Sequence, residues 1–381
     1  MTNPFVFASP VERPPQFVDR ESELRALVGL MRSGQGAVLI SPRRYGKTSL
    51  LRRAVIDASR DRTIRAGMCS LAEVLAAQGA KGVAERIAST VLFGPMGGLE
   101  GKLKGFQRLA AGLRPRLVLT TGDDGRPKLA LEGAPAEGDW SQAVADTVVV
   151  LAGLRKENLK PVLVIDEFQR AEELVPGFGW VFKDLTDRVE GLSLVLAGSK
   201  RHAMQQLADG PLQRVGAPMY LQKIERGIMV RHLLGLSGAA GKRMAEPVAE
   251  RIYDLMDGVP RDVHELAFWA FEVAGNQMAV SLEHVEAGLE TALGIRSDGY
   301  AARLNALAPV QGGVVVRLAH GAQPEPYAQA FMGAVGAKST TSMRKALAAL
   351  VEAELVERSP EGPWRLSDPM LRHWLVRRAQ A

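Results

Sequence analysis

The sequence places a lysine and two hydroxyl side chains directly after a glycine, in a stretch that could bind phosphate. Residues 41–49 lie between an apolar run, 37–40, and a segment, 47–58, whose apolar side chains recur at helical spacing. A loop between a buried strand and a helix presents backbone N–H groups to an anion, and glycine lets the backbone approach it closely. We therefore predict a nucleotide site made of Ser41, Pro42, Arg43, Arg44, Tyr45, Gly46, Lys47, Thr48 and Ser49.

Within this loop we assign Lys47 to the β and γ phosphates of a nucleoside triphosphate and Thr48 to Mg²⁺. Ser41 departs from the usual pattern, which begins with glycine. The alternative is a surface turn in which Thr48 caps a helix, but the flanking strand and helix favour the phosphate site. The sequence has no Asn-Lys-x-Asp motif that would read guanine, which favours ATP.

Two carboxylates follow a second apolar run. Asp166 and Glu167 come directly after residues 162–165, and open α/β sheets bind ligands at the carboxyl ends of their strands. We predict that Asp166 holds Mg²⁺ through water and that Glu167 is the base that polarises the attacking water. A pair that caps the next helix is the alternative.

A hydroxyl ends a third apolar run. Ser199 follows residues 192–197, and a polar side chain at the end of a neighbouring strand can orient the attacking water or the γ-phosphate. We predict that role for Ser199. An equal alternative is a cap for the helix that begins at Lys200.

Composition excludes several classes of protein. The 381 residues are 46% apolar and 24% charged, as in soluble globular proteins. No apolar run approaches the roughly 20 residues of a membrane helix, no secretory signal is visible, and Cys69 is the single cysteine. We expect a cytoplasmic protein without membrane contact. A net charge of +6 permits nucleic-acid binding without requiring it.

Alternating strands and helices predict an α/β core, a three-layer P-loop NTPase with a parallel sheet, over residues 1–220. A glycine-rich stretch and a hairpin form an insertion at about 94–135. Asp19 is expected to cap the first helix. A helical pattern then predicts a lid over 221–294, and helices followed by two short strands predict a winged helix over 295–381.

Several blocks along the chain resemble the archaeal-type ATPase family, a branch of P-loop NTPases close to the AAA+ and STAND groups. Residues 17–24 are similar to its F-x-x-R-x-x-E-L motif, and residues 42–50 resemble its P-R-R-x-G-K-T-S-L loop. Further matches are the Walker B form at 163–168, the polar strand end at 197–199, the G-x-P lid motif at 258–261 and the D-P and W-L ending at 366–375. Residues 210–214 are similar to its P-L-x-x-R segment, with one residue fewer before the arginine.

The resemblance implies binding of ATP and Mg²⁺, slow hydrolysis, and conformational switching or homo-oligomer assembly, in some members with DNA. By the same resemblance Arg214 is an arginine finger that completes a neighbouring subunit's site. A solvated charge or a packing ion pair is the alternative for Arg214. Arg261 follows the lid motif and would sense the γ-phosphate in cis, with an ordinary surface residue as the alternative.

The helix expected from Ser339 onward begins with side chains of the types that contact phosphates and base edges in recognition helices. Four glutamates at the end of this helix and in the wing, residues 352, 354, 357 and 361, would repel phosphate. The residues predicted to bind double-stranded DNA are Lys338, Thr340, Thr341, Arg344, Lys345 and Arg358.

Two functions from different classes remain open. The first is an ATPase whose nucleotide state controls assembly and DNA binding, with turnover through Glu167. The second is a signalling or defence switch that binds ATP tightly, hydrolyses it slowly and acts through a protein partner. Salt-dependent DNA affinity would favour the first, because release of counterions is the signature of phosphate contacts.

Overall fold

The protein folds into two structural units. The computed structural model describes residues 2–12, 14–95, 116–121, 127–132, 140–358 and 362–379. The first unit, called here the sheet unit, is Arg20–Gln222; the second, the helical unit, combines Met1–Asp19 with Lys223–Ala381. The predicted core began at residue 1, whereas the structure groups the first 19 residues with the helical unit. Phe5 explains this grouping, because it is buried among the side chains of that unit.

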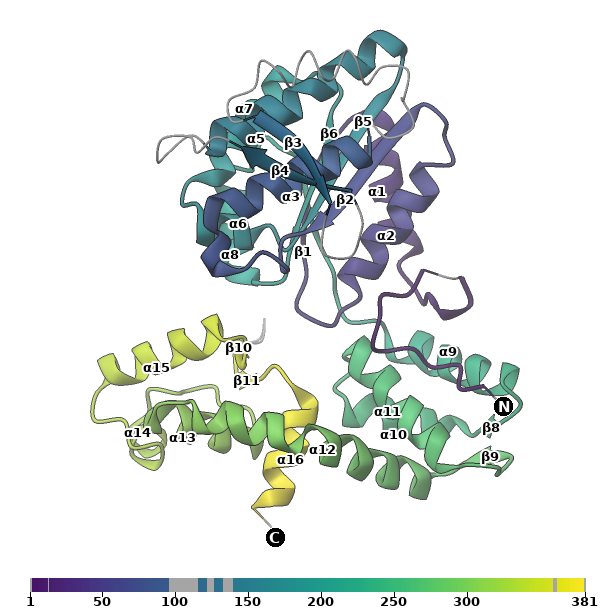
Figure 1. Cartoon of the computed structure of the whole chain (residues 1–381). Coiled ribbons are helices and arrows are strands. Elements are labelled where there is room, and N and C mark those ends of the chain that lie inside the picture. The colour runs from purple at the N-terminus through teal and green to yellow at the C-terminus, as the bar shows by residue number, and fades with distance from the viewer. Residues whose placement is uncertain are drawn as a thin grey trace. The chain divides into compact units, whose positions relative to one another are not determined.

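Five strands form a parallel sheet in the sheet unit (Figure 1). Their order is β2-β5-β6-β1-β7, and every neighbouring pair is parallel. The strands β1 and β6 are buried along their whole length, as expected of apolar runs in strands that are covered on both faces. The strands are β1 (Ala37–Ile40), β2 (Ile64–Ser70), β5 (Lys160–Asp166), β6 (Ser193–Gly198) and β7 (Ala217–Tyr220).

Helices cover both faces of this sheet, which confirms the predicted three-layer α/β fold. One face carries α1 (Glu21–Ser33) and α2 (Lys47–Ala58), which pack against each other. The other face shares a hydrophobic core with α3 (Gly79–Phe93), α5 (Trp140–Val149) and α7 (Phe178–Arg188). The remaining helical segments among the described residues of this unit are η2 (Ala76–Gln78), η4 (Val150–Glu157), α6 (Gln169–Leu174) and α8 (Arg201–Asp209).

The start of α1 differs from the prediction. Asp19 was expected to cap this helix, but the residue that precedes its first turn is Arg20, and no side chain caps the helix. Both residues have left-handed backbone conformations, with φ of 51° at Asp19 and 94° at Arg20. At its other end, α1 stops at Gly34, where a φ of 70° suits a glycine.

A β-hairpin lies in the region of the predicted insertion. Strand β3 (Arg116–Thr121) pairs antiparallel with β4 (Pro127–Glu132), and β4 lies beside α3. The predicted turn at 123–125 and the glycine-rich stretch from residue 96 onward are outside the described residues.

The first half of the helical unit contains four helices, which begin in the region predicted to be a lid, 221–294, but the last of them continues to Asn305, past the predicted boundary. Buried side chains from all four helices and Phe5 belong to one hydrophobic core, which continues into the second half of the unit. A short parallel pair of strands, β8 (Arg243–Met244) and β9 (Ala279–Val280), links the connection between the first two helices to the connection between the last two. The helices are α9 (Arg226–Ala239), α10 (Glu246–Leu255), α11 (Pro260–Val273) and α12 (Leu282–Asn305), and a single 3₁₀ turn, η1 (Pro14–Gln16), precedes the sheet unit.

The second half contains helices followed by two short strands, the pattern from which a winged helix was predicted. Three helices are followed by an antiparallel ribbon in which Val356 faces Leu366. Residues 359–361 of the predicted wing turn are outside the described part of the chain. The elements are α13 (Pro309–Ala319), α14 (Gln329–Ala334), α15 (Thr340–Glu352), β10 (Val356–Arg358), β11 (Trp364–Leu366) and α16 (Pro369–Arg378).

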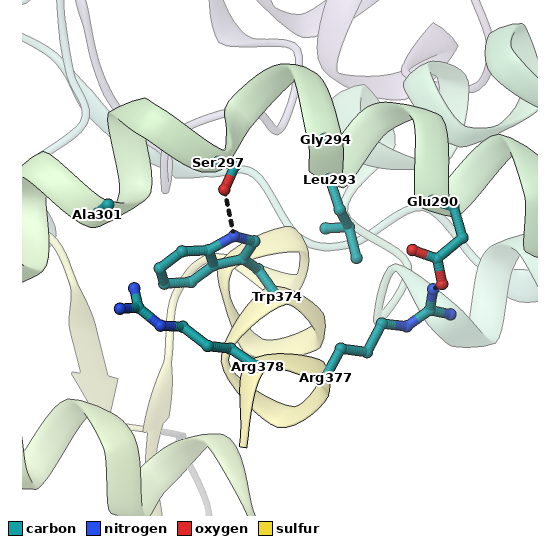
Figure 2. Close-up of a pocket in the computed structure, with 8 residues that line it drawn as sticks. All are labelled: Glu290, Leu293, Gly294, Ser297, Ala301, Trp374, Arg377 and Arg378. Atoms are coloured by element: carbon teal, nitrogen blue, oxygen red, sulfur yellow. Dashed lines mark hydrogen bonds and ion pairs between the residues drawn. The ribbon is translucent and has the colours of Figure 1, made fainter. Parts of the chain in front are cut away.

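An open groove of about 450 Å³ lies between α12 and α16 (Figure 2). Trp374 forms its floor, and its Nε1 donates a hydrogen bond to Ser297 Oγ at 3.1 Å. Arg378 lies over the indole ring, and Arg377 pairs with Glu286 at 3.2 Å and with Glu290. None of the residues predicted to bind ATP, metal or DNA lines this groove. Among the described residues, no helix is both long and apolar enough to cross a membrane.

Candidate active site

The carboxyl ends of three neighbouring strands carry the predicted site residues. The loop 41–46 follows β1, Asp166 ends β5, and Ser199 follows β6. Because β5 pairs with β6 and β6 pairs with β1, all in parallel, these three ends lie at one edge of the sheet. The helix α2 begins at Lys47 at the same edge, and the first N–H groups of a helix have no partner within it. The fold therefore gathers an ammonium, two carboxylates and hydroxyls beside a helix N-terminus.

The loop after β1 is held by its first and last residues. Ser41 is fully buried, and its N–H donates to the carbonyl of Gly198 at 3.2 Å. Gly46 has a φ of 86°, a conformation that favours glycine. Ser41 is not among the residues with positive φ. At Ser41 the sequence departs from the usual phosphate-loop pattern, which has glycine there. The backbone at this position does not need glycine, because its φ is not positive and its N–H is hydrogen-bonded.

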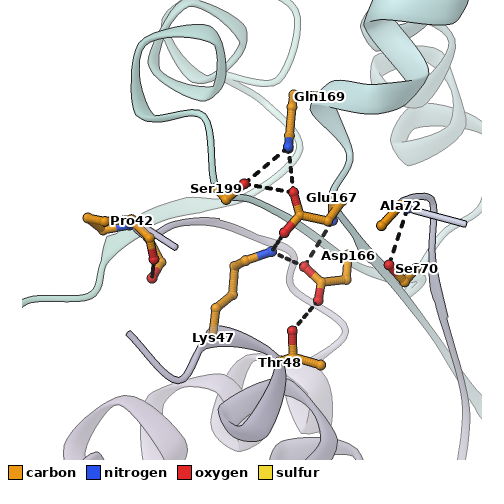
Figure 3. Close-up of polar contacts among 10 residues, drawn as sticks. Pro42, Lys47, Thr48, Ser70, Ala72, Asp166, Glu167, Gln169 and Ser199 are labelled. Carbon is orange, nitrogen blue, oxygen red and sulfur yellow. Dashed lines mark hydrogen bonds and ion pairs between the residues drawn. The ribbon is translucent and has the colours of Figure 1, made fainter. Parts of the chain in front are cut away.

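Lys47 connects the loop to both carboxylates (Figure 3). Its side chain is 6% exposed, and its Nζ donates to Asp166 Oδ1 and, at 2.6 Å, to Glu167 Oε1. Thr48 Oγ1 donates to Asp166 Oδ2 at 2.7 Å. A carboxylate and a hydroxyl oxygen side by side are hard ligands of the kind that Mg²⁺ prefers. Asp166 and Thr48 therefore fit the predicted magnesium site.

Glu167 is held by three donors. Besides Lys47, Ser199 Oγ donates to Glu167 Oε2 at 2.8 Å and Gln169 Nε2 donates to the same oxygen at 2.5 Å. Burial alone would raise the pKa of Glu167, but the charge and hydrogen bond of Lys47 and the bonds from Gln169 and Ser199 outweigh burial and lower the pKa. Glu167 is therefore an ionised carboxylate. Ser199 contacts this carboxylate, and the helix that follows has no side-chain cap.

Gln169 is a site residue that the sequence analysis missed. It lies in the first turn of α6, two residues after Glu167, and is 5% exposed. Its amide also lies 3.4 Å from Ser199 Oγ, so it joins the ends of β5 and β6. Gly198 makes room for it, because a Cβ at that position would overlap the Gln169 amide oxygen. The sequence offered one signal for Gln169: it is an amide side chain three residues after the end of β5. Side chains in the first turn of a helix that follows a strand lie close to the end of that strand.

Arg214, Arg261 and the predicted DNA contacts form no hydrogen bond or ion pair with this cluster among the described residues. Arg214 is in the sheet unit, exposed, and forms no hydrogen bond or ion pair with a described residue. Arg261 is in the helical unit, where its Nε donates to the carbonyl of Phe7 at 3.2 Å. The predicted DNA contacts are also in the helical unit, and all of them are exposed: Lys338, Thr340, Thr341, Arg344, Lys345 and Arg358.

Removal of a donor to Glu167 should destabilise the sheet unit in a pH-dependent way. The folded pKa of Glu167 is below its ordinary value of 4.5, so the bonds to its charged form add stability above that pH and lose it as the pH falls through the folded pKa. Hydrogen bonds to charged groups contribute about 1.5–3 kcal/mol. We expect Ser199→Ala and Gln169→Ala to lower Tm by several degrees at pH 7 and by less at pH 3.

Thermal unfolding between pH 3 and 7 measures this effect. The matched control is Ser70→Ala, because Ser70 Oγ accepts a hydrogen bond from the N–H of Ala72 at 3.3 Å and contacts no carboxylate among the described residues. Its Tm difference from the wild type should not change with pH. An equally large Tm loss for Ser199→Ala at pH 3 and pH 7 would contradict the role given to Glu167.

Solved structures share the fold over nearly the whole chain. The Walker-type ATPase PABY2304 of Pyrococcus abyssi is 17% identical, with a TM-score of 0.67 over 97% of this chain and 99% of that one. The ADP form of ORC2 of Aeropyrum pernix is 16% identical, with a TM-score of 0.56 over 98% of both chains. ORC1 of Aeropyrum pernix in complex with DNA is 14% identical, with a TM-score of 0.55 over 96% of this chain and 94% of that one.

No protein-family model matches the sequence, and no curated protein matches it. At identities of 14–17% these similarities establish the fold. The chain therefore has the three-layer fold of the Walker-type ATPases, with the cluster around Lys47 at the edge where such sheets bind their ligands.

Proposed function

We propose that this protein is a magnesium-dependent ATPase whose nucleotide state drives conformational change or assembly and is coupled to DNA binding. The observation that carries the proposal is the contact of Lys47 with both Asp166 and Glu167 at the carboxyl edge of the sheet. An ammonium that is held between two carboxylates beside a helix N-terminus suits a site where phosphate and a divalent cation bind together. The fold of Walker-type ATPases supports the same reading.

The residues of the cluster have distinct roles in this proposal. Lys47 and the first N–H groups of α2 bind the β and γ phosphates, and Thr48 and Asp166 hold Mg²⁺, which neutralises phosphate charge. Glu167 accepts a proton from the water whose oxygen attacks the γ-phosphorus. The bond from that phosphorus to the β–γ bridging oxygen breaks, and ADP keeps the electron pair. Ser199 and Glu167 together orient the water.

A second candidate is a switch that binds ATP and hydrolyses it slowly while it acts through a protein partner. The favouring observation is that Glu167 Oε2 accepts hydrogen bonds from both Gln169 and Ser199, while Lys47 contacts Oε1. A carboxylate has about four acceptor positions, and these donors occupy three of them, which lowers its basicity toward water. Turnover is then slow until a partner rearranges this cluster and removes a donor.

Assembly of several copies is proposed through Arg214. This arginine is exposed and has no bond to a described residue, so its guanidinium is available to a neighbouring copy. An arginine that reaches the γ-phosphate of another subunit stabilises charge in the transition state. The γ-phosphate role predicted for Arg261 also remains a proposal, because its described contact is with the carbonyl of Phe7 in the helical unit.

DNA binding is proposed through the start of α15. Lys338, Arg344 and Lys345 are exposed and have no ion pair with a described residue. The similar structure of ORC1, which is in complex with DNA, supports this proposal. Neutralising Z phosphates makes log K fall with log salt at a slope of about −0.9Z.

We expect the triple variant Lys338→Ala, Arg344→Ala, Lys345→Ala to weaken binding of duplex DNA and to reduce the salt slope by about 2 to 3. The measurement is DNA affinity between roughly 50 and 200 mM salt, a range over which a protein with several phosphate contacts loses affinity steeply. A control with the same charge change outside α15 is Arg231→Ala, Arg243→Ala, Arg303→Ala, all at exposed positions. Equal slopes for the two triple variants would contradict the assignment to α15.

The experiment that tests the proposed function is phosphate release from ATP by the wild type, with and without Mg²⁺ and with and without duplex DNA. Magnesium-dependent release that DNA stimulates supports the coupled ATPase. Tight ATP binding with little release and no effect of DNA favours the switch. Absence of ATP binding in the presence of Mg²⁺ would reject both functions.

A further inference from the structure

Arg20 is a buried arginine that has no role in the cluster described above. Its side chain is 6% exposed, and its Nη1 donates to Glu23 Oε1 at 3.0 Å. Its Nη2 donates to two main-chain carbonyls, that of Tyr45 at 3.4 Å and that of Gln222 at 2.5 Å. Tyr45 belongs to the nucleotide loop, two residues before Lys47. One guanidinium therefore joins this loop to the last residue of the sheet unit.

The chain crosses between the two units twice, and Arg20 is at both crossings. It is the first residue of the sheet unit, and it binds the carbonyl of the last one, Gln222. Its left-handed φ of 94° follows a φ of 51° at Asp19. Non-glycine residues hold such conformations at a cost, and only where surrounding contacts fix them. Leu221 is fixed too, because its N–H donates to the carbonyl of Ile40, the last residue of β1, at 3.1 Å.

The chain is anchored again as soon as it enters the helical unit. Lys223 Nζ donates to the carbonyl of Asp257 at 2.5 Å, and the hydroxyl of Tyr253 donates to the carbonyl of Ile224 at 2.8 Å. The carboxylate of Asp257 pairs with Arg372 of α16 at 2.9 Å. Held segments therefore flank the second crossing, with Leu221 and Gln222 bonded within the sheet unit and Lys223 and Ile224 bonded within the helical unit.

We propose that Arg20 is a positioning residue that transmits the state of the nucleotide loop to the helical unit. A guanidinium keeps its donors in one plane, so displacement of one acceptor shifts or breaks the bond to the other. If the Tyr45 carbonyl moves when ATP binds, the hydrogen bond from Arg20 to the Gln222 carbonyl shifts or breaks. Gln222 and the next residue, Lys223, then move as well. This inference rests on the ATP site proposed above.

Glu23 keeps this guanidinium in place. Burial alone would raise the pKa of Glu23, but hydrogen bonds from Ser22 and Arg20 outweigh burial and lower it. A charged carboxylate therefore faces Arg20 at neutral pH, and it holds the guanidinium while its other amino group binds the two carbonyls.

Energy transfer between two dyes in the full-length protein tests the proposal. One dye is attached at Ser59→Cys in the sheet unit and one at Asn276→Cys in the helical unit, both exposed positions. The native Cys69 does not interfere, because it is buried and burial raises its pKa to about 11. Transfer is measured with and without saturating MgATP in the Arg20→Ala protein and in a control, Arg25→Ala, at an exposed position of the same helix.

We expect MgATP to change the transfer efficiency in the wild type and in Arg25→Ala, and to leave it unchanged in Arg20→Ala. The Arg20→Ala protein should still bind ATP, roughly tenfold more weakly, since one charged hydrogen bond to the loop is lost. A full response in saturated Arg20→Ala protein would overturn the proposal. A wild type that binds ATP without any response would overturn it too, with the proposed function intact, whereas a wild type that binds no ATP would reject the proposed function itself.

Discussion

Replacement of Lys47 by alanine will abolish ATP binding and will also destabilise the sheet unit. The first effect follows because Lys47 is the one ammonium that the loop places among the described carboxylates at this edge. The second follows because Asp166 is 1% exposed and would be left beside Glu167 without a cation. Loss of one partner from a buried ion pair costs about 3–5 kcal/mol. Calorimetric titration with MgATP and thermal unfolding measure the two effects separately.

The pH dependence of this destabilisation has a definite sign. Without Lys47, two carboxylates lie side by side with no cation between them, and their repulsion is greatest at a pH where both are charged. Its Tm deficit should be largest at neutral pH and should shrink as the pH falls toward and through the ordinary carboxyl range of about 4. Adding Asp166→Asn removes the repulsion, so the double variant should recover stability but not ATP binding. Unchanged ATP affinity in Lys47→Ala would defeat the assignment of the loop.

Most of the sheet was predictable because its central strands are continuous apolar runs. Residues 162–165 and 192–197 anticipate β5 and β6 closely. The edge strand β7 was missed, because it is largely exposed and contains Pro218. An edge strand tolerates proline, since one side of it needs no ladder hydrogen bonds, and its apolar signal is correspondingly weak.

The candidate site was predictable where its chemistry is local and not where it depends on packing. Lys47 and Asp166 belong to recognisable loop and strand-end patterns, and the parallel sheet brings them together. Gln169 reaches Glu167 only because Gly198 has no side chain to fill the space that the Gln169 amide occupies. Arg20 binds the carbonyls of Tyr45 and Gln222, which are distant from it in the sequence. Carbonyl acceptors carry no sequence signature, because every residue has one.

Replacement of Glu167 by glutamine should preserve ATP binding and remove turnover. Glutamine keeps the shape of the side chain, and its amide oxygen can still accept the bond from Lys47 that Glu167 Oε1 accepts at 2.6 Å. Because one negative charge beside Lys47 is gone, we expect ATP affinity to be equal or higher. The variant has no base for the attacking water, and loss of a general base lowers rates by about 10²- to 10⁴-fold.

Single-turnover phosphate release and calorimetric ATP affinity, measured on the same protein, separate the two proposed functions. A wild type that releases phosphate at least a hundredfold faster than Glu167→Gln uses this carboxylate as a base, whereas equal rates mean that the three donors to Glu167 keep it from acting as one.

If Arg214 completes the site of a neighbouring copy, Arg214→Ala protein mixed with Glu167→Gln protein should regain turnover. In that mixture an intact Glu167 on one copy meets an intact Arg214 on another, while either variant alone lacks one of the two. Mixed assemblies without activity would place Arg214 outside the reaction, and the phosphate charge would then be stabilised by Lys47 and Mg²⁺ within one copy.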